Sequence, residues 1–207
     1  MRFFLNMRRG LSRAVFAGFA LFVGALSVDS LAVAVTVGQA FPAVAAKGLK
    51  VEDRVGLTTP GKVTIVNFWA TWCEACKIEL AEFETKFKPL VANSDFQVTL
   101  VSLDKDPAKA KDWFKSNIRD QAMFERTSLV DPEFQIADQL AVDAFPMTFV
   151  VGRDGKVAHI QRGYKPELKQ TEELVKIATG LLGAGSAAPA TAAASGKATP
   201  APPIAGE

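Results

Sequence analysis

The 207-residue chain has two cysteines, Cys73 and Cys76, and both come just after an apolar, β-branched run at residues 63–69. Two thiols with two residues between them, at the point where a strand leads into a helix, can close a small disulfide and open it again. A disulfide across so short a loop removes little chain entropy, so it adds little to folding stability. The spacing therefore indicates redox chemistry rather than a structural crosslink.

The sequence offers few further metal ligands beside the two cysteines. A structural zinc site takes four ligands, and the chain adds one histidine, His159, far from the cysteines along the sequence. We therefore expect no bound metal. The redox-active pair Cys73 and Cys76 takes the place of a separate cofactor.

Residues 1–32 are typical of a targeting segment. Four arginines precede the apolar stretch 14–28, which has the length of a signal-peptide hydrophobic region and is short for a membrane span. Small residues at Ser30 and Ala32 suit a cleavage site before Val33. Two outcomes stay open, a cleaved signal peptide and a retained membrane anchor. Both place the rest of the chain in the periplasm or another extracytoplasmic space.

The remainder of the chain is nearly neutral. Removing residues 1–32 takes away four arginines and one aspartate, which leaves 20 basic and 21 acidic residues. Because there is no basic excess to bind phosphate backbones, we expect no nucleic-acid partner. Residues 183–207 are mainly Ala, Pro, Gly, Ser and Thr, a composition that buries no core and predicts a disordered tail. One globular domain is therefore expected at residues 33–182.

Strand and helix patterns alternate within this domain. Runs of β-branched and apolar residues predict strands at residues 62–69, 96–103, 147–151 and 156–161. Apolar residues spaced by three and four predict helices at residues 73–91, 107–117, 132–140 and 167–182. This order predicts an α/β protein with a mixed central β-sheet flanked by helices, an N-terminal extension and a helical insertion.

Two motifs together resemble one protein family. Residues 67–73 read Asn-Phe-Trp-Ala-Thr-Trp-Cys, and Phe145-Pro146-Met147-Thr148 precedes the last predicted hairpin. The combination resembles the thioredoxin fold and, more narrowly, the TlpA/ResA group of membrane-associated extracytoplasmic thiol:disulfide oxidoreductases. The resemblance covers about residues 40–180. It implies a thioredoxin fold and an enzyme that exchanges disulfides with proteins.

The two cysteines have distinct expected roles. Cys73 is expected at a helix N-terminus, where unpaired N–H groups and the helix dipole favour a thiolate. Its thiolate would attack a substrate disulfide, and Cys76, one turn further in, would resolve the mixed disulfide.

Glu79 stands three residues after Cys76, so on a helix it neighbours that cysteine. The resemblance implies a glutamate here that tunes the cysteines and moves protons. A partly buried carboxyl beside a thiolate has a raised pKa and can serve as acid or base. The alternative is a solvated glutamate paired with Lys77 or Lys86.

The resemblance also assigns a substrate-binding side. It implies that Pro146 is a cis-proline facing the dithiol and that the backbone of Phe145 binds an extended substrate strand. Trp72 is expected to be an exposed platform that contacts partners. Asn67 stands where cytoplasmic thioredoxins have a buried, proton-accepting aspartate, and a neutral amide there favours the TlpA/ResA type.

The function implied by the resemblance is reduction of disulfides in specific extracytoplasmic proteins, such as apocytochrome c haem-binding motifs or oxidase copper-site cysteines. A membrane thiol electron donor of the DsbD/CcdA kind would keep the pair reduced.

Two alternatives stay open. One is a dithiol oxidase that inserts disulfides, although Glu74, an anion between the cysteines, is ill placed to stabilise a thiolate. The other is a non-catalytic thioredoxin-like copper chaperone or adaptor, with Cu(I) on the two thiolates and Met147 as the nearest further ligand.

Overall fold

Strand β3 (Val63–Trp69) lies at the centre of a seven-stranded sheet and is buried along its whole length. The computed structural model describes residues 34–50, 53–124 and 127–184. The expected targeting segment at residues 1–32 lies outside the described residues, as does residue 185 onward of the expected tail at residues 183–207. Gly183, the first residue of that expected tail, is instead the last residue of a helix. In the described ranges, no helix is both long and apolar enough to cross a membrane.

The sheet is mixed, as predicted. Its strand order is β2-β1-β5-β4-β3-β6-β7, and β3, β4 and β5 run parallel while the remaining pairs are antiparallel. The strands besides β3 are β1 (Ala45–Gly48), β2 (Arg54–Gly56), β4 (Phe96–Ser102), β5 (Ser128–Val130), β6 (Met147–Val151) and β7 (Val157–Arg162). The thioredoxin-type fold class is confirmed.

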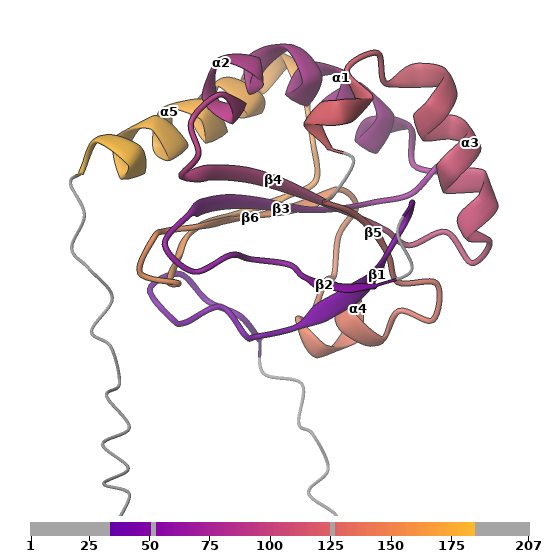
Figure 1. Ribbon diagram of the computed structural model, residues 1–207, viewed down its shortest axis with the longest axis horizontal. Helices are drawn as coiled ribbons and strands as arrows, with labels where there is room; N and C mark the ends of the chain where they lie inside the picture. Colours follow the sequence, from indigo (N-terminus) through magenta and orange to yellow (C-terminus); the bar gives the residue numbers. More distant parts are fainter. Residues whose placement is uncertain (1–33, 51–52, 125–126, 185–207) are drawn as a thin grey trace, which may run out of the picture. The chain divides into compact units, whose positions relative to one another are not determined.

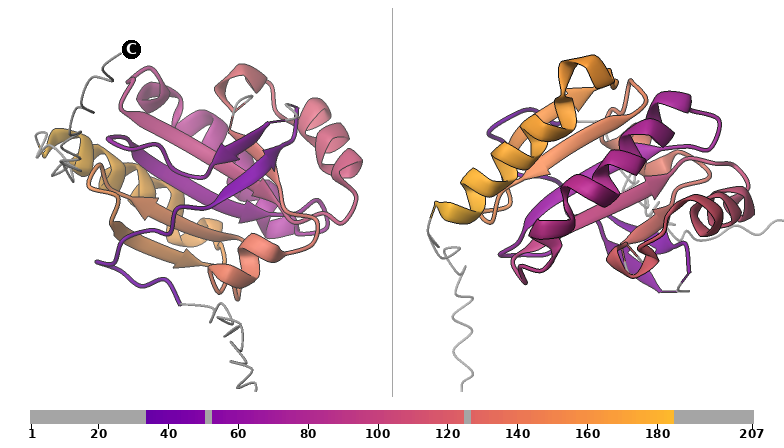
Figure 2. Two further views of the ribbon diagram at one scale, coloured as in Figure 1. Left: turned by 60° about the horizontal axis from the view of Figure 1, so that its bottom comes forward. Right: turned by 90° about the horizontal axis from the view of Figure 1, so that it is seen from above.

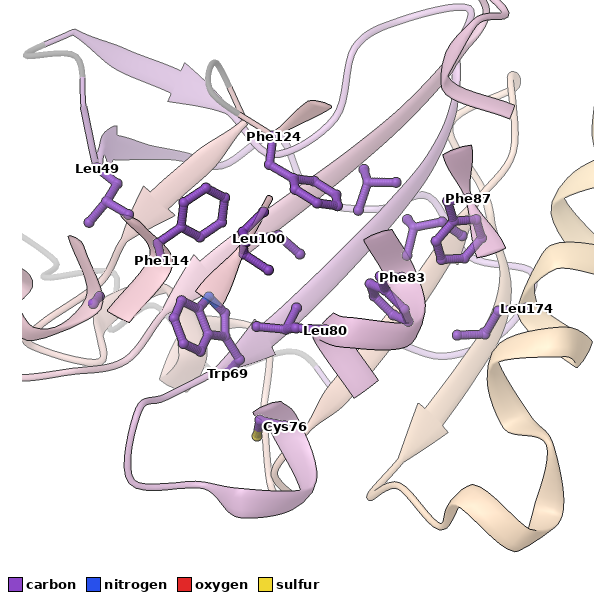
Figure 3. Close-up of a cluster of buried hydrophobic side chains, with 14 of the residues drawn as sticks. Leu49, Trp69, Cys76, Leu80, Phe83, Phe87, Leu100, Phe114, Phe124 and Leu174 are labelled. Atoms are coloured by element: carbon purple, nitrogen blue, oxygen red, sulfur yellow. The ribbon is translucent and has the colours of Figure 1, made fainter. Parts of the chain in front are cut away.

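Helices cover both faces of this sheet (Figures 1 and 2). One face carries α1 (Glu74–Lys86), α2 (Lys88–Val91), α3 (Pro107–Asn117) and α5 (Gln170–Gly183), and the other carries α4 (Gln135–Gln139). The sheet separates two apolar clusters, one beneath each helical layer. Figure 3 shows the cluster under α1 and α5, where Trp69, Leu80, Phe83 and Leu174 meet. Burial of this cluster fixes α1 over β3 and so positions the start of α1.

The prediction of one continuous helix at residues 73–91 is wrong, because the structure has two helices there, α1 and α2. The N–H of Phe87 closes α1 on the carbonyl of Phe83 at 3.0 Å, and α2 starts afresh at Lys88. Pro89 lies in the first turn of α2. A proline has no N–H and its ring collides with the carbonyl four residues earlier, so an uninterrupted helix cannot pass through it.

Two other helices begin later than the sequence predicts. The helix predicted at residues 132–140 begins at Gln135, after Phe134 with a φ of 60°. The helix predicted at residues 167–182 begins at Gln170, after a short 3-10 turn and Lys169 with a φ of 51°. A left-handed residue cannot continue a right-handed helix, so each marks a new start.

The predicted pattern also omits β1, β2 and β5, where the sequence analysis expects an N-terminal extension and a helical insertion. These strands contain four, three and three residues. Such short runs give no measurable alternation, so their pairing is decided by the neighbouring strands.

Candidate active site

The two cysteines form a disulfide at the N-terminus of α1. Cys73 is the N-cap residue, and its Sγ accepts a hydrogen bond from the N–H of Cys76 at 3.2 Å. Cys73 is 8% exposed, whereas Cys76 is 0% exposed. Of the two cysteines, Cys73 is therefore the one that borders solvent.

The loop that delivers Cys73 is fastened by a buried aspartate. Asp104 follows β4, and its carboxylate accepts from the N–H of Thr71 at 3.0 Å and from the hydroxyl of Thr71 at 2.6 Å. The hydroxyl of Ser102 donates to the same carboxylate at 2.8 Å. The end of β4 thus holds the residue two positions before the first cysteine. The sequence analysis missed Asp104, and the available signal was an acidic residue directly after a buried strand.

Glu79 is fully buried beneath α1. Its Oε2 accepts from the side-chain amide of Asn67 at 2.7 Å, and its Oε1 accepts from the amide of Gln161 at 2.6 Å. Burial away from water raises the pKa of Glu79 to about 8, although the donors oppose this rise. The carboxyl is therefore mostly protonated at neutral pH and can exchange a proton near it.

The alternative of a solvated Glu79 paired with lysine does not hold. Lys77 pairs with Glu74 at 2.5 Å, and Lys86 pairs with Glu172 at 3.0 Å. Both lysines therefore bind exposed carboxylates.

Three sheet strands supply the polar residues around Glu79. Asn67 comes from β3, Thr148 from β6 and Gln161 from β7. The amide of Asn67 also donates to the Thr148 hydroxyl at 2.8 Å. Among the described residues, its Oδ1 is buried without a hydrogen-bond partner. The sequence analysis named Asn67 but missed Thr148 and Gln161, because strand pairing across more than 80 positions brings them together.

The three predicted substrate-binding residues lie together beside the motif. Trp72 is 60% exposed, and its ring packs edge-on against that of Phe145 with 5.4 Å between centroids. The peptide bond between Phe145 and Pro146 is cis. Trp72 is thus an accessible aromatic surface next to the disulfide, and Pro146 has the geometry expected of it.

The described residues were also considered as metal ligands, and they offer no cluster of that kind. In the ranges 34–50, 53–124 and 127–184, no group of three or more His, Cys, Asp and Glu side chains could hold a metal ion.

A thioredoxin fold with an accessible disulfide at a helix N-terminus defines a thiol-disulfide oxidoreductase. Residues 36–175 match the model of the Redoxin family. The chain therefore belongs to the Redoxin family, and the predicted resemblance is confirmed.

Relatives with assigned names are also thiol-disulfide exchange proteins. The chain is 27% identical over 150 residues to thiol-disulfide oxidoreductase ResA of Geobacillus thermodenitrificans, covering 69% of this chain and 80% of the relative. It is 30% identical over 159 residues to the thiol:disulfide interchange protein DsbE homolog of Paracoccus denitrificans, covering 72% and 81%. The predicted enzyme class, a thiol-disulfide oxidoreductase of the ResA/DsbE type, is confirmed.

Solved structures share the fold. A crystal structure assigned as thiol:disulfide interchange protein DsbE from Chlorobium tepidum superposes with a TM-score of 0.60 at 25% identity, covering 70% of this chain and 98% of the other. A secreted thiol-disulfide isomerase from Corynebacterium glutamicum gives a TM-score of 0.58 at 22% identity, covering 69% and 84%.

Proposed function

We propose that the chain reduces disulfides of specific proteins outside the cytoplasm, with Cys73 as the nucleophile. The observation that carries this proposal is the difference in exposure between Cys73, at 8%, and Cys76, at 0%. In the reduced enzyme the first turn of α1 stabilises the Cys73 thiolate, which attacks one sulfur of the client disulfide. A mixed disulfide forms and the other client sulfur leaves as a thiolate.

Cys76 completes the exchange. Its thiolate attacks the sulfur of Cys73, which releases the client as a dithiol and restores the Cys73–Cys76 disulfide. Two electrons pass from the enzyme to the client. Because Cys76 is buried, its proton needs an acceptor inside the protein, and Glu79 lies one helical turn further along α1. With a pKa near that of a thiol, the deprotonated form of Glu79, which is the minor form at neutral pH, can take this proton and return it to solvent.

The client binds over Trp72, Phe145 and Pro146 in this proposal. The exposed ring of Trp72 covers apolar client side chains, and the backbone of Phe145 pairs with an extended client segment.

The setting of the reaction rests on the sequence and on the named relatives. Residues 1–32 target the chain to the periplasm or hold it at the inner membrane, and residues 33–182 form the domain. Clients are cysteine-containing proteins of the cytochrome c or oxidase copper-site maturation type. A membrane thiol donor of the DsbD/CcdA kind supplies the electrons.

The first test is the midpoint potential of the Cys73–Cys76 pair, equilibrated against glutathione and dithiothreitol. A value of about −240 mV or lower supports a reductant that needs an upstream donor. A value near −120 mV, roughly that of strong disulfide-forming oxidants, contradicts reduction and supports the dithiol oxidase. Tight binding of one Cu(I) by the reduced pair, with no disulfide exchange, supports the copper chaperone instead.

A second test traps clients on the enzyme. Cys76→Ser leaves Cys73 free to attack but removes the resolving thiol, so mixed disulfides with clients accumulate. The matched control Cys73→Ser retains a buried thiol and traps no client. Equal trapping by the two variants would contradict the assigned order of attack.

A further inference from the structure

Gln161 is a buried polar residue that the reaction described above does not use. It lies on β7, is 5% exposed, and donates to Oε1 of Glu79 at 2.6 Å. Asn67 donates to the other oxygen, Oε2, at 2.7 Å. Each oxygen of Glu79 therefore has its own amide donor, one from the centre of the sheet and one from its edge strand.

These amide donors oppose the effect of burial. An N–H that points at a carboxyl stabilises the charged form more than the neutral form, whereas removal from water disfavours the charge. The hydrogen bonds from Asn67 and Gln161 both lower the pKa of Glu79, against the larger rise due to burial. Gln161 thus makes release of the proton easier at a site where burial resists it.

Glu82 acts on Glu79 in the opposite direction. It lies three positions further along α1, on the same side of the helix and half-buried. Its negative charge adds to the rise in the pKa of Glu79. The Tyr164 hydroxyl donates to Glu82, and burial, followed by this hydrogen bond, raises the pKa of Tyr164 to about 12.

Among the described residues, two titratable groups act on Glu79 electrostatically. Glu82 lies on its own helix, and Tyr164 lies in the segment after β7. The strands β3 and β6 contribute the neutral side chains of Asn67 and Thr148.

We infer that Gln161 is a positioning residue for disulfide exchange, which holds one oxygen of Glu79 and, with Glu82 acting in the opposite sense, sets the pH range in which Glu79 exchanges its proton. This inference rests on the proposed role of Glu79. Gln161 acts through Glu79 rather than on a reacting sulfur.

The direct test is a carbon-detected NMR titration of glutamate side-chain carboxyls in the oxidised full chain. Glu79→Gln assigns the resonance by removing it. Gln161→Met keeps the shape of the side chain but removes the donor, so the midpoint of Glu79 is expected to rise by about one pH unit. Glu82→Gln removes the neighbouring charge, so the midpoint is expected to fall. The matched control Gln139→Met, at an exposed position of α4, leaves it unchanged.

A general loss of packing does not raise the Glu79 midpoint in Gln161→Met and lower it in Glu82→Gln. An unchanged midpoint in Gln161→Met, or shifts of the same sign in both variants, overturns the inference. Where Gln161→Met fails to fold, Gln161→Asn shortens the side chain and withdraws its amide from Glu79, and the same rise in the midpoint is expected.

Activity separates this inference from the function on which it rests. The pH profile of client reduction is expected to move with the NMR midpoint, upward in Gln161→Met and downward in Glu82→Gln. A Glu79→Gln variant with an unchanged profile contradicts the role of Glu79 itself. A Glu79→Gln variant with a changed profile, together with an unmoved midpoint in Gln161→Met, contradicts the role of Gln161 alone.

Discussion

Two buried carboxyl groups flank the redox motif, and they differ in what they bind. Asp104, 2% exposed, accepts from the backbone N–H of Thr71 and from two hydroxyl groups. Glu79, 0% exposed, accepts from the side-chain amides of Asn67 and Gln161. A carboxylate bound to backbone fixes a loop, whereas one held by side chains can change its protonation while the backbone stays in place. In the proposed mechanism, this difference in donors separates the carboxyl that fixes a loop from the carboxyl that exchanges a proton.

The largest expected effect is the pH dependence that Glu79 gives to folding stability. Its pKa is about 8 when folded, above the ordinary 4.5 that it has when unfolded. The stabilisation is therefore full below pH 4.5 and is lost as the pH rises through 8, by roughly 5 kcal/mol in total. Urea unfolding at pH 5 and pH 9 measures this loss, and Glu79→Gln is expected to remove most of it. If the unfolding free energy fell equally between pH 5 and pH 9 in the wild type and in Glu79→Gln, Glu79 would not be the group that binds the proton.

The second largest loss of folding stability is expected when Asp104 is removed. Asp104→Ala leaves the N–H and hydroxyl of Thr71 without their acceptor, so the free energy of unfolding is expected to fall by about 3 kcal/mol. Chemical denaturation at pH 7 gives the value. A loss below about 1 kcal/mol would mean that the loop does not depend on Asp104.

A smaller effect is expected when one donor to Asp104 is removed. Thr71→Val deletes the hydroxyl that lies 2.6 Å from the carboxylate and keeps the backbone N–H. The expected loss in unfolding free energy is about 1 kcal/mol. Thr179→Val, on an exposed position of α5, is the matched control, and an equal loss in both would contradict a specific contact.

The smallest effect on stability is expected at the exposed aromatic beside the disulfide. Trp72→Ala should change the unfolding free energy by less than about 0.5 kcal/mol, because the side chain is 60% exposed. Client reduction is expected to lose affinity, seen as a higher KM, while reduction of a small disulfide keeps its rate. Equal losses for the protein client and the small disulfide would contradict a client-binding role for Trp72.

Local patterns in the sequence were sufficient for the bounds of several elements. The strand predicted at residues 62–69 differs from β3 by one residue, and the bounds of α3 and β6 are as predicted. These segments have long apolar runs or clear caps, and in such segments the local preference and the tertiary environment agree. The position of Glu79 near Cys76 followed from helix spacing for the same reason.

The surroundings of Glu79 could not be predicted in this way. Gln161 reaches Glu79 through the pairing of β7 with β6 and of β6 with β3, and a register irregularity lies between Val150 and Val151. A shift of one residue along β7 would turn Gln161 to the other face of the sheet. A single sequence does not contain this register, so a glutamine 82 positions away has no visible link to Glu79.

The sheet topology also sets an order of assembly. The bonds to Glu79 span 12 positions for Asn67 and 82 positions for Gln161, and β7 reaches Glu79 only where β6 is paired with β3. Contacts between neighbours in sequence form early, whereas closure of a long loop is slow. A chain that is still emerging or crossing a membrane can therefore bring its two thiols together before its last strand arrives. The thiols can then pair before Glu79 receives the amide of Gln161.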